Sequence, residues 1–213
     1  MRAAISRSIS SFITSPGLRN FRRRWHRLLA GKATVHYFHQ PDDPYSQLAA
    51  QLLPKLRDVY KVEITSHIVS PPEKAAAPEY ERLINLASVD ATLLAGAYGL
   101  KSPSADACPP DAAKDGDALR KKLGHYLSGM FYFEGEWYWG VDRLHFLEER
   151  LRAWNLVKDR NTALIVPAKE VTLAGKPGSA KGATLDYFLS FRSPYTYLAV
   201  PRVRKLADHY GAT

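Results

Sequence analysis

The sequence predicts an α/β protein that holds one complete unit followed by the opening of a second copy of that unit. Two observations lead to this prediction. Residues 35–60 and 185–210 align without a gap at an offset of 150 positions, and ten of the 26 aligned residues are identical. Such an offset indicates a repeated domain, because solenoid repeats have periods of about 20–50 residues. The second observation is that strand and helix signals alternate along the first copy.

A strand–helix–strand unit opens the first copy. Residues 33–39 (ATVHYFH) form a short run of β-branched and aromatic side chains, which predicts a strand. Asp43 and Pro44 then mark a helix start, since an Asp side chain caps the first turn and Pro fits the first helical position. Apolar residues recur at helical spacing from Tyr45 to Leu56, and residues 62–68 alternate as a second strand. The two strands are expected to be parallel, with a right-handed crossover.

The rest of the first copy reads as a helical insert followed by a hairpin and a helix. We expect helices over 79–98 and near 117–127, strands over 130–133 and 137–139, a helix over 141–154 and a further strand over 162–166. Residues 174–182 (AGKPGSAKG) have the composition of a flexible linker. The order βαβ, helical insert, ββα is that of a thioredoxin-like fold with helices inserted in its middle.

These elements divide the chain into four expected segments. They are a basic N-terminal arm (1–32), a thioredoxin-like domain (33–154), a linker (155–182) and the start of a second domain (183–213). About thirty residues cannot bury a core of their own. We therefore expect either a fragment of a longer tandem protein or an appended β-α unit that packs onto the first domain or onto another chain.

The positive charge is concentrated in the arm. The chain has a formal net charge of +9, and residues 1–32 hold eight Lys or Arg and no Asp or Glu. The other 181 residues are nearly neutral, which argues against nucleic-acid binding through the fold. The arm fits an organelle presequence, an amphipathic segment that touches an anionic membrane, or a solubilising tail. A single cysteine, Cys108, and the lack of a long apolar run predict a cytoplasmic protein, with an organellar location as the alternative.

Three stretches resemble the DsbA-like thioredoxin superfamily. Within it they resemble the branch of 2-hydroxychromene-2-carboxylate isomerases and kappa-class glutathione transferases. Residues 185–199 (LDYFLSFRSPYTYLA) are similar to that branch's first strand and helix start, and residues 35–50 are a weaker version of the same motif. Residues 135–149 (GEWYWGVDRLHFLEE) are similar to its closing hairpin and Gly-x-Asp-Arg-Leu helix.

The resemblance implies a glutathione-dependent isomerase or transferase acting on a small electrophilic substrate, with a homodimer as a possible assembly. It makes Ser193 the candidate catalytic residue, whose hydroxyl would hydrogen-bond the sulfur of glutathione at a helix N-terminus. A plain helix cap is the competing explanation of Ser193. The candidate glutathione- and substrate-binding residues are Arg192, Pro194, Tyr195, Asp142 and Arg143.

The first copy is expected to be catalytically degenerate. Thiol oxidoreductases of this fold carry Cys-x-x-Cys at this helix start, whereas the two copies here have Asp43-Pro44-Tyr45-Ser46 and Ser193-Pro-Tyr-Thr. Neither contains a thiol, so neither can act as a dithiol–disulfide oxidoreductase. Asp43 would repel a thiolate, and Gly129 stands where the family usually has a cis-proline. The alternative to an enzyme is therefore a non-catalytic scaffold or binding module, and no metal site is expected.

Overall fold

A computed structural model describes residues 32–213 apart from residues 76, 78, 105–111, 170–171 and 192. Residues 1–31 of the expected arm, Cys108 and Arg192 therefore lie outside the described residues. The chain divides into two compact units, Met1–Ala168 and Lys169–Thr213. Residues 155–168, expected to be part of the linker, belong to the first unit.

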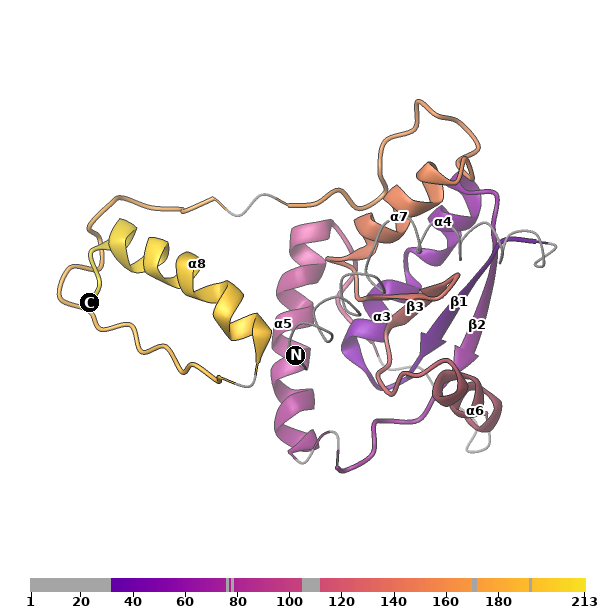
Figure 1. Cartoon of the computed structure of the whole chain (residues 1–213), viewed down its shortest axis with the longest axis horizontal. Coiled ribbons are helices and arrows are strands. Elements are labelled where there is room, and N and C mark those ends of the chain that lie inside the picture. The colour runs from indigo at the N-terminus through magenta and orange to yellow at the C-terminus, as the bar shows by residue number, and fades with distance from the viewer. Residues whose placement is uncertain (1–31, 76, 78, 105–111, 170–171, 192) are drawn as a thin grey trace, which may run out of the picture. The chain divides into compact units, whose positions relative to one another are not determined.

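A mixed four-stranded sheet forms the centre of the first unit (Figure 1). Strand β1 (Thr34–His39) pairs in parallel with β2 (Glu63–Ile68) and antiparallel with β3 (Met130–Phe133), which pairs antiparallel with β4 (Glu136–Trp139). The strand order is β2-β1-β3-β4. The predicted α/β class is confirmed, and the first unit has the predicted succession of a βαβ unit, a helical insert and a ββα unit.

Two helices replace the single helix expected between the first two strands. These are α3 (Pro44–Ala50) and α4 (Leu53–Val59). Pro54 lacks a backbone N–H, so it interrupts a continuing helix but suits the first turn of a new one, and α4 begins there. The remaining helices of this unit are α5 (Tyr80–Tyr98), α6 (Lys114–Lys122) and α7 (Leu144–Ala153).

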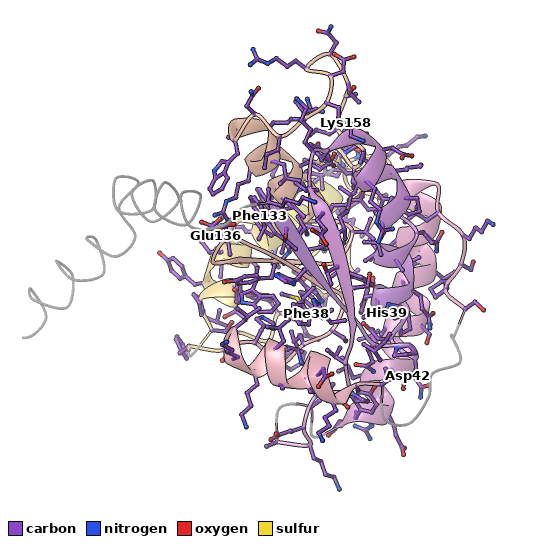
Figure 2. All side chains as sticks on the ribbon, turned by 90° about the vertical axis from the view of Figure 1, so that its right-hand side faces the viewer. Phe38, His39, Asp42, Phe133, Glu136 and Lys158 are labelled. Carbon is purple, nitrogen blue, oxygen red and sulfur yellow. The ribbon has the colours of Figure 1, made fainter. Side chains whose placement is uncertain are left out.

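Alternate side chains of the strands serve two hydrophobic clusters, one on each face of the sheet. Tyr37, Phe131 and Phe133 join the larger cluster, together with buried residues of α3, α4, α5 and α7. Phe38 and Met130 join the smaller cluster, against which Leu119 of α6 packs. Figure 2 shows Phe38 and Phe133 within the sheet, with Asp42 beyond the end of β1 and Lys158 at the opposite end of the domain.

The expected strand over residues 162–166 was wrong. This segment has irregular backbone, and its amide groups bond to a side chain instead of a neighbouring strand. The fully buried carboxylate of Glu148 on α7 accepts hydrogen bonds from Ile165 N at 2.7 Å and Val166 N at 2.9 Å. The Tyr60 hydroxyl donates to the same carboxylate at 2.8 Å. Glu148 thereby holds Ile165 and Val166, near the end of the first unit, against α7 through hydrogen bonds.

The second unit contains helix α8 (Pro194–Tyr210), but the strand expected before it is also absent from the described residues. Tyr187 and Phe188 are 37% and 89% exposed, whereas their first-copy equivalents Tyr37 and Phe38 are at most 1% exposed. A strand requires a neighbour for its backbone hydrogen bonds, and the described part of this unit supplies none. Of the helices described in either unit, none is long and apolar enough to cross a membrane.

Candidate functional site

The candidate site is the start of the helix that follows the first strand position of each copy. In the first copy Asp43 is the N-cap of α3, with φ −88° and ψ 117°, and Pro44 follows it. In the second copy Ser193 is the N-cap of α8, with φ −107° and ψ 116°, and Pro194 follows it. Both caps therefore have the extended backbone typical of this position.

The turns that lead into the two helices share hydrogen bonds at equivalent positions. The cap amide donates to the residue three positions earlier: Asp43 N to Gln40 O and Ser193 N to Ser190 O, both at 3.1 Å. The tyrosine upstream of the cap donates to the first turn of the helix: the Tyr37 hydroxyl to Ser46 O, and the Tyr187 hydroxyl to Thr196 O. The same local turn thus occurs twice, 150 residues apart. Among the described residues, a strand precedes only the first of the two turns.

The carboxylate of Asp43 is engaged by donors of its own domain. Its Oδ1 accepts from Tyr45 N at 3.3 Å, and its Oδ2 accepts from Ser46 N at 3.1 Å. The hydroxyls of Ser46 and Ser128 also donate to Oδ2, at 2.7 Å and 3.0 Å. Since the side chain is buried, these bonds replace water around the negative charge. The Asp43 carboxylate thus compensates the positive end of α3, and the described residues there include no thiol.

Gly129 lies directly against this helix start. A Cβ atom on Gly129 would come within 3.4 Å of Ser46 N and 3.5 Å of Asp43 Oδ2, and its φ of +64° is unfavourable for any other residue. Its amide donates to Phe38 O at 2.9 Å, which holds it beside β1. The structure therefore brings Asp43, Ser46 and Gly129 together.

Ser193 differs from Asp43 in leaving its side chain unused. The Ser193 hydroxyl makes no capping bond to α8 and no other hydrogen bond with the described residues. The Thr196 hydroxyl occupies the neighbouring acceptors, donating to Ser190 O at 2.7 Å and Ser193 O at 2.9 Å. Tyr195 is exposed. Ser193 thus offers a hydroxyl at the N-terminus of a 17-residue helix.

Asp142 and Arg143 lie in the first unit, just before α7. Both are about half exposed, and Arg143 Nε is 3.9 Å from Asp142 Oδ2. The Arg143 guanidinium also lies 5.9 Å from the centre of the Trp139 ring, which in turn contacts the Tyr45 ring at 6.1 Å. These contacts link the start of α7 to the start of α3.

A hollow of about 120 Å³ adjoins Asp43. Its apolar wall comes mainly from α5 and from the loop before β3, and Trp139 closes one side. The polar lining residues are Gln40, Asp43, Tyr45, Tyr80 and Ser128. The sequence did not predict Gln40 or Tyr80 as site residues, and an aromatic ligand wall was only the second explanation of Trp139, after packing in the hairpin and core. The position of Gln40 directly after a buried strand was the one available signal.

The hollow is bordered by the carboxylates of Asp43 and, through Tyr45, Asp90, and by the Arg143 guanidinium beside Trp139. Burial raises the pKa of Tyr45, and the hydrogen bond from its hydroxyl to Asp90 at 2.7 Å raises it further. Burial likewise raises the pKa of Tyr80; the hydrogen bond from Gln40 opposes this shift, and Asp42 and Asp43 reinforce it. Both tyrosines therefore stay neutral.

The described residues contain no group of three or more His, Cys, Asp or Glu side chains that could hold a metal ion. Comparison with known proteins gives no match: no family model fits the chain, and no curated protein or solved structure is significantly similar to it.

Proposed function

We propose that the chain belongs to a glutathione-dependent isomerase or transferase of the 2-hydroxychromene-2-carboxylate isomerase type. Ser193 would hold the thiol of glutathione, and the first copy would be catalytically inactive. The observation that carries this proposal is the contrast between the two helix starts. Asp43 is bonded to four donors of its own domain, whereas the Ser193 hydroxyl is bonded to no described residue.

The topology of the first unit supports the thioredoxin-like part of the proposal. The order β2-β1-β3-β4, with one parallel and two antiparallel pairings, is the order expected when βαβ and ββα units share a sheet in that fold. Helices α5 and α6 lie between the βαβ segment and the ββα segment in the sequence, as an inserted helical segment should.

The residues at the start of α8 fit the thiol of glutathione. The hydroxyl of Ser193, which bonds to no described residue, can donate to sulfur, and the amide groups of the first turn of α8 favour an anion there. When bound, glutathione supplies a thiolate that adds to an electrophilic carbon. Ser193 would hold that sulfur in its ionised form and orient it. Pro194 has no backbone N–H and suits the first position of α8. The ring of Tyr195 is exposed and offers a flat apolar surface to a substrate.

Calorimetric titration of glutathione into the natural full-length protein tests this function. We expect saturable binding that weakens at least tenfold in Ser193→Ala and is unchanged in Ser190→Ala, a matched serine three residues away. Aromatic enones would then be screened as substrates. Absence of binding at millimolar glutathione would overturn the proposal.

The second candidate function is a binding module without chemistry. The Asp43 carboxylate favours it for the first unit, because its hydrogen bonds to Ser46 and Ser128 hold it as a structural cap of α3. Normal folding without glutathione binding or turnover would favour this alternative.

A further inference from the structure

We propose that the hollow beside Asp43 binds a primary ammonium group carried on a short apolar stem. This site lies entirely in the first unit and does not involve Ser193. It is therefore independent of glutathione chemistry, and either proposal can fail without the other.

The first argument is a buried unpaired acceptor on a residue that lines the hollow. Gln40 is only 1% exposed, and its Nε2 donates to Asp42 Oδ1 at 3.0 Å and to the Tyr80 hydroxyl at 2.6 Å. A carboxylate oxygen only accepts, so the contact with Asp42 fixes the orientation of the Gln40 amide. Its Oε1 is then a buried acceptor that no described residue satisfies. A buried carbonyl without a donor calls for a ligand or water that donates to it.

The second argument is the sign of the charge. The described residues that line the hollow include Asp43 and no Lys, Arg or His, and the Arg143 guanidinium lies 5.9 Å from the centre of the ring of the lining residue Trp139. Asp42 contacts the lining residue Gln40, and Asp90 contacts the lining residue Tyr45. A carboxylate or thiolate ligand would meet these negative charges unfavourably, whereas an ammonium group would be attracted and could donate to Gln40 Oε1.

The third argument is size and wall chemistry. The hollow has a volume of about 120 Å³. It is well below the roughly 300–1,000 Å³ of most small-molecule sites. The hollow therefore suits an amine head with a few methylene groups. Leu83, Leu127 and Trp139 offer apolar contact for the stem. Both a free alkylamine and a lysine side chain of a polypeptide have this chemistry.

Nuclear magnetic resonance titration of the full chain tests the site, with the indole N–H of Trp139 as reporter. The probes are n-butylammonium chloride, sodium butyrate as the charge-reversed control, and Nα-acetyl-lysine amide. We expect saturable shifts with n-butylammonium at millimolar concentration and no saturation with butyrate. Tighter binding of the lysine derivative would identify a polypeptide side chain as the source, and weaker binding would identify a free amine.

Two variants separate the site from general stability. Gln40→Met removes the acceptor at similar volume and should weaken n-butylammonium binding at least fivefold. Gln47→Met is the matched control, because Gln47 is also buried but does not line the hollow. The proposal is overturned if butyrate binds as well as n-butylammonium, or if Gln40→Met binds n-butylammonium as the unchanged protein does.

Discussion

One side chain distinguishes the chemistry open to the two helix starts. Asp43 and Ser193 share a backbone conformation, a following proline and equivalent turn hydrogen bonds. The Asp43 carboxylate accepts hydrogen bonds from two backbone amides and two hydroxyls of its own domain. These bonds hold it in place as the cap of α3. The shorter hydroxyl of Ser193 bonds to none of the described groups. The residue types were evident from the sequence, but the saturation of Asp43 was not, because Ser128 lies 85 residues away.

Replacing Asp43 with Ala should destabilise the first unit by about 2 kcal/mol. The change removes a helix cap and leaves the buried Ser46 and Ser128 hydroxyls without their acceptor. Urea unfolding measures the effect. Asp58→Ala, at an exposed aspartate of α4, is the control and should stay within about 0.5 kcal/mol. An unchanged midpoint for Asp43→Ala would show that the carboxylate network contributes little.

Glu148→Gln should release residues 155–168 from α7. The amide is nearly isosteric with the carboxylate, but its NH₂ group would face a backbone N–H that now donates to oxygen. We expect a loss of about 2 kcal/mol and faster hydrogen exchange at Ile165 and Val166. Glu149→Gln is the exposed neighbour for comparison. Unaltered exchange at both amides would contradict the anchoring role.

Helix α5 has two apolar faces, and only one of them is buried by the described residues of the first unit. The buried face consists of Ala87, Ala91 and Ala95, and α5 packs against α3. The larger side chains Leu86 and Leu93 are 67% and 68% exposed. The spacing of apolar residues predicted the helix correctly but not its inner face. Alanines allow two helices to approach closely, a requirement that only the three-dimensional neighbour reveals.

Substitutions on the two faces of α5 should therefore differ sharply. Ala91→Leu places a large side chain into the contact with α3 and should cost about 1–3 kcal/mol. Leu93→Lys should change the stability by no more than about 0.5 kcal/mol, because its side chain contributes little to the core. Thermal or urea unfolding of the two variants checks this. Equal losses would mean that the outer face is packed in solution.

The sequence predicted the strand of the first copy correctly and the matching strand of the second copy wrongly. Residues 34–39 and 184–189 have similar patterns, yet only the first segment is a strand. A strand depends on partners far along the chain, whereas a helix start depends on neighbouring residues. The turn geometry at Asp43 and Ser193 therefore recurs without the sheet. The hollow beside Asp43 was unpredictable for a related reason, since Gln40, Tyr80 and Trp139 come from distant elements.

The molecule as a whole should lose stability on mild acidification, because partly buried histidines resist protonation. His36 Nδ1 on β1 lies 2.9 Å from His67 Nε2 on β2. Burial lowers the pKa of both rings. Glu134 and Glu63 oppose this shift at His36, whereas His36 reinforces it at His67. Burial and then Arg120 lower the pKa of His125 as well.

The sign of the effect follows from proton counting. Near pH 6.5 and below, the unfolded chain binds protons at these histidines that the folded chain does not. The free energy of unfolding should therefore be greatest above about pH 7 and fall as the pH drops through 6.5 toward the lower pKa values of the folded state. Urea unfolding between pH 7.5 and 5.5 measures this slope. His67→Gln removes one titrating ring and relieves His36, so its slope should be shallower. A slope that is flat, or equally steep in the variant, would mean that the pair is not held neutral by the fold.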